Sequence, residues 1–339
     1  MTTELRQALG PLAVLLDDPA VTDVLVNGDS GVWVDRGAGA QRTDAVLNDQ
    51  ASVRRLAVRL AGLAGRRLDD AAPWVDGLLP GGVRLHAVLP PLVSGGAHLS
   101  LRVPRTGAAS VTDLQARGML DELGRRVIEA VVAARCSFVI TGGTGTGKTT
   151  LLAAMLSSAA DRERIVVVED VRELHVPHPH VVYLQGRDRN VEGRGEITLT
   201  TLVRQSLRMR PDRVVVGEVR GPEVRELLAA LNTGHEGGCG TLHANAGVDV
   251  VPRFEALGAL AGMAPAAVHA QLVSAIQVTV HLARSAGGRR ELAGVSLLGL
   301  GPGGRAEVRP ALVGGPGRWE HGPGWPALEQ VLSLRPGTR

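Results

Sequence analysis

The chain has 339 residues, of which 44% are hydrophobic and 21% charged, with a formal net charge of +3. This length favours two domains over one, and the composition is typical of a folded protein rather than a disordered one. No apolar stretch reaches the roughly 18 residues that a membrane-spanning helix needs. The N-terminus lacks the charge-then-apolar order of a signal peptide. Two cysteines cannot build a disulfide framework or a four-cysteine zinc site. We therefore expect a soluble, cytoplasmic protein without zinc.

The basic residues are almost all arginine. Of the 37 lysine and arginine residues, only Lys148 is lysine. This skew indicates a coding bias, so lysine is expected only where a planar guanidinium cannot replace a compact ammonium. With one Tyr, two Phe and four Trp, the chain also lacks the interleaved aromatics that bind single-stranded nucleic acid by stacking. The arginines are interpreted as a solvated surface, and no direct nucleic-acid partner is expected.

Residues 1–108 predict a small α+β domain. Strands are expected on either side of an Asn-Gly turn, within 17–28 and 31–35. A helix with apolar spacing follows near 52–63, and two alternating strands near 83–91 and 97–103 complete the domain. A short join at 106–110 leads to the second domain, predicted over 109–300. Its first segment, 111–135, is expected to be helical, with plausible helix starts at Asp113, Leu114 and Leu120.

The second domain contains a glycine-rich loop between an apolar strand at 137–141 and a helix that continues through 151–156. This is the P-loop spacing in its strand–loop–helix setting. The loop's N–H groups and the helix N-terminus are predicted to bind nucleotide phosphates. Lys148 is expected to reach the β- and γ-phosphates, and Thr149 to ligate Mg²⁺. The predicted nucleotide-binding residues of the loop are Gly142, Gly143, Thr144, Gly145, Thr146, Gly147, Lys148, Thr149 and Thr150.

Two later apolar strands end in carboxylates. The strand at 213–216 leads to Glu218, which is expected to lie beside the γ-phosphate and orient the attacking water. The standard acidic motif has an aspartate just before such a glutamate, but this chain has Gly217 there. Either Mg²⁺ is then held largely through water, or another acid helps. Glu169 and Asp170, which follow the strand at 165–168, are the first candidates for that acid, and Glu173 is the next.

The rest of the chain predicts helices over 248–261 and 266–275 and a hairpin over 277–298 around Gly287 and Gly288. After Gly301 the sequence is rich in Gly, Pro and Trp without usable periodicity. Residues 301–339 are therefore predicted to be a C-terminal tail.

Four motifs, taken together, resemble those of the secretion-ATPase superfamily, which drives type II secretion, type IV secretion and type IV pilus assembly. Besides the P-loop, 169–174 resembles its aspartate box, 207–223 its second acidic motif and 232–245 its histidine box. The resemblance runs from about residue 17 to about residue 300. The motif sequences are most similar to those of the CpaF-like branch, the ATPases of tight-adherence (Flp-type) pili, often labelled TadA.

The resemblance implies an α/β, RecA-like P-loop core with a smaller N-terminal α+β domain of PAS-like type. It implies a hexameric motor that hydrolyses ATP with Mg²⁺ and docks on a platform protein at the cytoplasmic face of the inner membrane. His243, in the histidine box, would sense ATP against ADP, whereas His235 has no such role. The expected catalytic set is then Glu218, Glu169, His243 and Lys148.

Arginines are the remaining part of the predicted site. In the family the N-terminal domain supplies arginines that stabilise charge on the transferred phosphoryl group. By motif match these are Arg84, Arg102 and Arg105. Arg208 and Arg220, on either side of the Glu218 strand, are rivals for the same role.

Two other functions remain open. A helicase-like or conjugative nucleic-acid motor would use the same type of core, because fold alone does not decide function. A nucleotide-binding switch without turnover is the third alternative. Scarce aromatics and the histidine box disfavour the former, and Glu218 with a complete P-loop disfavours the latter. The sequence does not distinguish pilin, another protein or DNA as the exported substrate.

Overall fold

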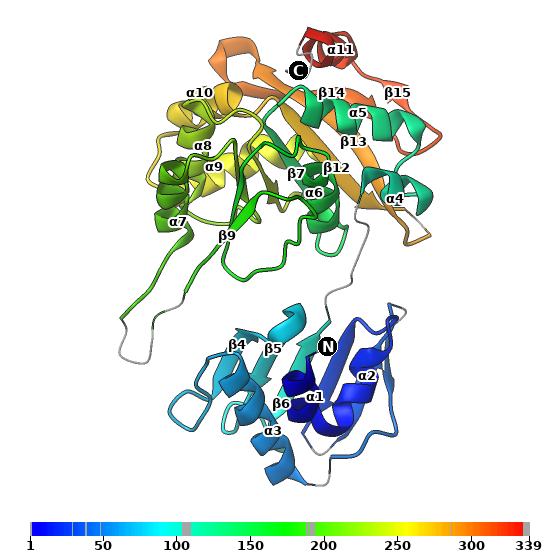
Figure 1. Cartoon of the computed structure of the whole chain (residues 1–339). Coiled ribbons are helices and arrows are strands. Elements are labelled where there is room, and N and C mark those ends of the chain that lie inside the picture. Colours follow the sequence, from blue (N-terminus) through cyan, green and yellow to red (C-terminus); the bar gives the residue numbers. More distant parts are fainter. Residues whose placement is uncertain are drawn as a thin grey trace. The chain divides into compact units, whose positions relative to one another are not determined.

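A computed structural model describes residues 2–334 of the chain, except 29, 38, 48, 104–109, 188, 190–193 and 286. The chain folds into two compact units (Figure 1). Unit 1 comprises Met1–Thr106 with Val171–Glu173, and unit 2 comprises Gly107–Asp170 with Leu174–Arg339.

Unit 1 is an antiparallel sheet covered by helices. Within the described residues its six strands have the order β3-β2-β1-β6-β5-β4, and each neighbouring pair is antiparallel. Alternate residues of the strands pack with α1, α2 and α3 in one apolar core, as the two-residue period of a strand requires. The predicted α+β character is confirmed, although α1, α2, β3 and β4 were not foreseen. The elements are α1 (Thr3–Leu9), α2 (Ala13–Asp17), β1 (Asp23–Asn27), β2 (Val32–Asp35), β3 (Ala40–Arg42), α3 (Gln50–Leu63), β4 (Trp74–Leu78), β5 (Arg84–Val88) and β6 (His98–Arg102).

Unit 2 is built on a larger sheet with the strand order β15-β14-β13-β12-β7-β11-β10-β8-β9. From β12 to β9 all neighbours are parallel, whereas β13, β14 and β15 extend the sheet in antiparallel fashion. Its strands are β7 (Phe138–Gly142), β8 (Ile165–Glu169), β9 (Val181–Gln185), β10 (Arg213–Val216), β11 (Cys239–Leu242), β12 (Val278–Arg284), β13 (Arg290–Leu300), β14 (Ala306–Val313) and β15 (Glu320–His321).

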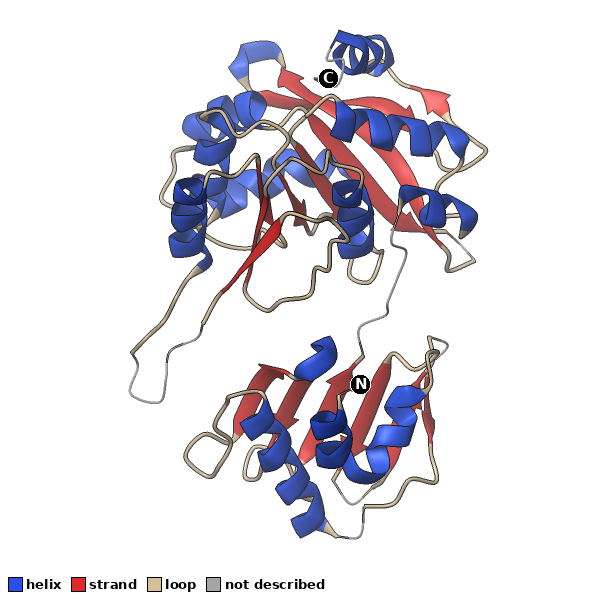
Figure 2. Ribbon diagram, in the orientation of Figure 1, coloured by secondary structure: helices blue, strands red, loops and turns tan. Residues whose placement is uncertain are grey.

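Helices cover both faces of this sheet (Figure 2). Phe138 and Ile140 of β7 pack into a core with α4, α5 and α6, whereas Val139 packs into a core with α7 to α10 on the other face. Burial on both faces explains why the central strands are continuously apolar. The predicted α/β class is confirmed. The helices are α4 (Val111–Ala116), α5 (Glu122–Ala133), α6 (Lys148–Ser157), α7 (Leu199–Ser206), α8 (Val224–Asn232), α9 (Val250–Leu260), α10 (Pro265–Ala275) and α11 (Trp325–Leu334), with the short turns η3 (Leu207–Met209) and η4 (Gly247–Asp249).

Parallel pairing fixes where the functional segments meet. The P-loop, the acids after β8, Glu218 after β10 and His243 after β11 all follow the carboxyl ends of neighbouring parallel strands. In an open α/β sheet, ligands bind along this edge. The fold therefore gathers at one edge segments that are more than a hundred residues apart.

A buried arginine anchors the opposite edge. Arg213, at the amino end of β10, is 1% exposed, and its guanidinium donates to both carboxylate oxygens of Glu163 and to the carbonyl oxygens of Val132 and Gly237. Burial alone would raise the pKa of Glu163. The hydrogen bond and charge of Arg213, together with the charge of Arg135 and the Ala160 N–H, lower that pKa in sum. The start of β10 is thus tied to both of its flanking segments.

The structure refines two sequence-based predictions about unit 2. The helical segment 111–135 is two helices, because Gly118 has a φ of +75° and Asp121 caps α5 by accepting from the Gly124 N–H. The tail predicted for 301–339 contains two strands and a helix, and β14 pairs with β13. The alternation of apolar and polar residues along β14 is irregular, because its pairing with β13 shifts register between Val295 and Ser296 of β13.

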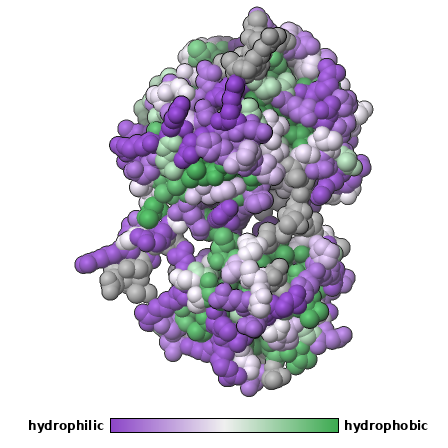
Figure 3. Space-filling model, viewed as in Figure 1, coloured by the Kyte–Doolittle hydropathy of each residue, from purple (hydrophilic) through white to green (hydrophobic). Residues whose placement is uncertain are grey.

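Hydrophilic side chains cover most of the surface of each unit on the face drawn in Figure 3, and apolar side chains form smaller patches. Such patches are normal for a folded protein. Among the described residues, no helix is both long enough and apolar enough to span a bilayer.

Candidate active site

The P-loop leaves the central strand β7 and runs directly into α6. Gly142, Gly145 and Gly147 have φ angles of +148°, +72° and +98°, a region that favours glycine. A Cβ atom at position 142 would lie 2.5 Å from the carbonyl oxygen of Leu282 on the adjacent strand. Thr146 closes the loop internally by donating its hydroxyl to the Gly143 carbonyl at 2.9 Å. This tight turn is the backbone geometry that presents N–H groups to a phosphate.

Lys148 is the first residue of α6 and is only 8% exposed. Its ammonium donates to the carbonyl oxygens of Gly142 and Gly143, each at 3.0 Å. Burial lowers the pKa of Lys148, and the charge of Glu218 acts in the opposite direction. The ammonium thus lies in a compact setting made by the loop itself.

The predicted residues Glu218 and His243 meet beside this lysine. His243 Nε2 lies 2.6 Å from Glu218 Oε1 and 3.5 Å from Lys148 Nζ. Glu218 and His243 are each partly exposed, with about 40% of either side chain accessible. The structure therefore brings three of the four predicted catalytic side chains together at the end of the P-loop strand.

Glu169, the fourth, is buried under the loop after β8. Its Oε1 accepts the Leu174 N–H at 3.0 Å. A Cβ atom at Gly217 would lie 2.5 Å from Glu169 Cγ and 2.9 Å from Glu169 Oε1. Glu169 thus fills the space into which the aspartate of the standard acidic motif would project, which explains the glycine.

This packing predicts that Gly217→Asp, which restores the standard motif, is harmful. The new side chain would overlap Glu169, and overpacking of this kind costs about 1–3 kcal/mol. We expect a lower free energy of unfolding and a lower rate of ATP hydrolysis, measured by denaturant titration and phosphate release. Gly287→Asp is the matched control, because that glycine lies in an open turn with no atom closer than 4.0 Å to its Cβ position. A fully stable and active Gly217→Asp protein would contradict the packing argument.

The predicted arginines have different surroundings. Arg220 forms an ion pair with Asp170, also at the carboxyl edge of the sheet. Arg208 is exposed on η3, before the amino end of β10, so the structure does not bring it to the P-loop edge. In unit 1, Arg84 and Arg102 are direct cross-strand partners on β5 and β6. Arg105 lies outside the described residues, and the role of these three arginines stays a prediction.

Two residues of β12 contact the site and were missed by the sequence analysis. His281 Nδ1 lies 2.9 Å from the Thr141 hydroxyl, directly before the P-loop. Burial lowers the pKa of His281, against the opposing charge of Asp249. Arg284 donates to the Gly145 carbonyl inside the loop. No motif marks either residue, and only the parallel pairing of β12 with β7 reveals them.

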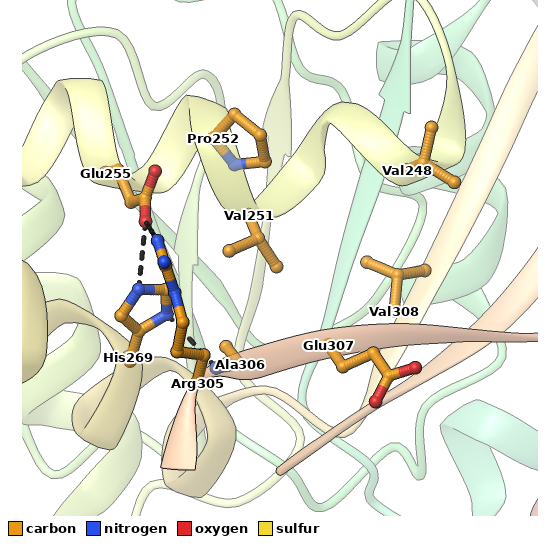
Figure 4. Close-up of a pocket in the computed structure, with 9 residues that line it drawn as sticks. All are labelled: Val248, Val251, Pro252, Glu255, His269, Arg305, Ala306, Glu307 and Val308. Carbon is orange, nitrogen blue, oxygen red and sulfur yellow. Dashed lines mark hydrogen bonds and ion pairs between the residues drawn. The ribbon is translucent and has the colours of Figure 1, made fainter. Parts of the chain in front are cut away.

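A separate pocket of about 350 Å³ lies between α9, α10 and the start of β14 (Figure 4). At one end Glu255 contacts both His269 and Arg305, at 2.9 and 3.3 Å. Val248, Val251 and Val308 line the rest. None of the predicted site residues lines this pocket, so it is distinct from the P-loop site.

The fold and the loop geometry define a P-loop protein of the α/β class. The chain belongs to the type II/IV secretion system protein family, whose model matches residues 6–292. A putative conjugal transfer protein of Mycobacterium tuberculosis is 55% identical over 304 residues, which cover 88% of this chain and 86% of that protein. The conjugal transfer protein TrbB of Rhizobium radiobacter is 32% identical over 296 residues, covering 86% and 88% of the two chains.

Solved structures agree with the fold. The crystal structure of the pilus retraction motor PilT with bound ADP matches 96% of this chain and 86% of that one, with a TM-score of 0.61 and 19% identity. At that identity the match supports the fold alone.

Proposed function

We propose that the protein is an ATP-hydrolysing motor of a type II or type IV secretion or pilus system. The observation that carries the proposal is the meeting of Lys148, His243 and Glu218 at the end of the P-loop strand. A lysine that binds phosphate beside a carboxylate that orients water is the arrangement that phosphoryl transfer to water needs. The family supports the same activity.

Mg²⁺ fits the donors that this edge offers. Thr149, Glu218, Glu169 and Asp170 supply hard oxygen ligands, which magnesium prefers. Among the described residues, no group of three or more His, Cys, Asp and Glu side chains could hold a metal ion. Glu218, Glu169 and Asp170 are therefore not gathered into one metal site. Mg²⁺, which binds through one or two carboxylates, nucleotide phosphates and water, would use only part of this set. When bound, the ion would neutralise charge on the phosphates during transfer.

The chain's own residues would then act as follows. Lys148 would exchange its two carbonyl partners for phosphate oxygens, which are stronger acceptors. Glu218 would accept a hydrogen bond from the attacking water and orient it. His243 Nε2 lies 2.6 Å from Glu218 Oε1 and 3.5 Å from Lys148 Nζ. Because it contacts both residues, His243 would respond to the presence or absence of the γ-phosphate.

The assembly is proposed to be a homo-hexamer. Arg84, Arg102 and Arg105 lie outside the chain segment that carries the P-loop, and we propose that they complete the site of a neighbouring subunit. Head-to-tail contacts of this kind give a ring when the rotation between subunits closes, and the family resemblance makes that ring a hexamer. The ring is proposed to act in the cytoplasm, on a platform protein at the inner membrane.

We also propose a substrate for the motor. The motif sequences favour assembly of Flp-type pili by a CpaF-like ATPase. Conjugal transfer is the second candidate, because the relatives of Mycobacterium tuberculosis and Rhizobium radiobacter carry that name. A nucleic-acid motor in the stricter sense would be stimulated by single-stranded DNA.

The experiment compares ATP hydrolysis by the purified full-length protein with and without Mg²⁺, and with and without single-stranded DNA. We expect Mg²⁺-dependent turnover that DNA does not stimulate. Absence of turnover in both the dilute and the assembled protein would refute the motor. Deletion of the gene in its host, followed by microscopy for pili and a mating assay, separates the two cargoes.

A further inference from the structure

Arg284 brings a charged side chain to the outside of the P-loop. Strand β12 runs parallel to β7 with Leu282 opposite Gly142, so the end of β12 lies against the start of the loop. Two residues further on, Arg284 Nη2 donates to the carbonyl oxygen of Gly145 at 3.1 Å. Its Nη1 donates to the carbonyl oxygen of Gly288, in the turn between β12 and β13, at 3.3 Å. The guanidinium therefore bridges the hairpin and the loop.

The loop leaves room for this contact. A Cβ atom at position 145 would lie 3.2 Å from Arg284 Nη2, and Gly145 has a φ of +72°. A side chain at this position would be strained by the backbone and crowded by the arginine. The glycine thus permits both the turn and the approach of the guanidinium.

The contact also fixes the direction of a neighbouring N–H group. The Gly145 carbonyl and the Thr146 N–H belong to one trans peptide, so they point in opposite directions. A charged donor on the carbonyl holds this peptide plane and polarises it, which strengthens the N–H as a donor. The Thr146 N–H contacts the Gly143 carbonyl at 3.5 Å, longer than an ordinary hydrogen bond. In this structure the N–H points at that carbonyl through a long, weak hydrogen bond, which a phosphate oxygen could replace as the stronger acceptor.

We propose that Arg284 is a positioning residue for phosphate binding, which holds the Gly145–Thr146 peptide in place so that the Thr146 N–H can exchange the Gly143 carbonyl for a phosphate oxygen of the nucleotide. The inference rests on the proposed nucleotide site. Arg284 would act through the loop and would not touch the nucleotide. Its loss would weaken ADP and ATP to a similar degree, because the N–H it orients serves a phosphate that both nucleotides share.

The test uses full-length Arg284→Ala, Arg284→Gln and Arg284→Lys proteins. The matched control is Arg289→Ala, since Arg289 is an exposed arginine of the same hairpin. A fluorescent ADP analogue gives the Kd, steady-state hydrolysis gives kcat and KM, and thermal unfolding without nucleotide gives the Tm. For Arg284→Ala we expect the Kd for ADP and the KM for ATP to rise about five- to tenfold, with kcat within about twofold of wild type. Lysine should restore part of the affinity, because its ammonium can still donate to one carbonyl.

A purely structural role would lower the Tm without nucleotide and would not separate KM from kcat. Unchanged ADP affinity in both Arg284→Ala and Arg284→Gln would overturn the inference, as would an equal loss in Arg289→Ala. If the wild-type protein binds no ADP, the proposed function fails first, and this inference fails with it.

Discussion

Replacing Lys148 by arginine is expected to abolish ATP hydrolysis, although the substitution keeps the positive charge. The ammonium lies 3.0 Å from the carbonyl oxygens of both Gly142 and Gly143, and His243 Nε2 is 3.5 Å away. A planar guanidinium is broader than an ammonium and needs a different arrangement of acceptors. In a buried setting it would have to displace the loop. We expect turnover to fall by at least about a hundredfold, as for other lost transition-state donors.

Phosphate release measures the turnover, and thermal unfolding of the Lys148→Arg protein checks that it folds. Lys148→Ala serves as the comparison, because it removes the charge without adding bulk. If both variants fold and both are inactive, hydrolysis requires the positive charge at position 148 and also a side chain no broader than an ammonium. Turnover like that of the wild type in Lys148→Arg would show that the interpretation of the single lysine is wrong.

The sequence predicted this part of the site because its signals are local. The P-loop is one continuous strand, turn and helix, and Gly142 and Gly147, the two glycines that the motif specifies, both have positive φ. Glu218 and His243 follow short apolar strands, and parallel strands bring their carboxyl ends to one edge. The P-loop motif placed Lys148, the expectation of parallel strands placed Glu218, and the family resemblance placed His243; the strand order that joins them is seen only in the structure.

Contacts that depend on register could not be foreseen. Arg284 and His281 reach the P-loop only because β12 pairs with β7, and no spacing in the sequence indicates which strands are neighbours. Gly217 is similar, since its lack of a side chain makes sense only once Glu169 is seen in the space beside it. The strands after Gly301 were missed because β14 alternates imperfectly in burial.

Glu218→Gln is expected to bind ATP but hydrolyse it at least about a hundredfold more slowly, the contribution typical of a positioned general base. Glutamine keeps the size of the side chain and an oxygen that can accept from His243 Nε2, which lies 2.6 Å from Glu218 Oε1. It loses the negative charge and most of the basicity, so water is no longer oriented and activated. The P-loop and Lys148 are unchanged, so the nucleotide should still bind.

Separation and quantification of the nucleotide that stays bound after incubation with ATP is the decisive measurement. Wild-type protein should carry mainly ADP, whereas Glu218→Gln should carry mainly ATP. Glu307→Gln is the control, because it removes an exposed carboxylate on β14, away from the P-loop strand. If Glu218→Gln hydrolyses ATP normally, the water-orienting role passes to Glu169 or Asp170. Glu169→Gln would then separate those two, because Glu169 already accepts the Leu174 N–H and Asp170 is paired with Arg220.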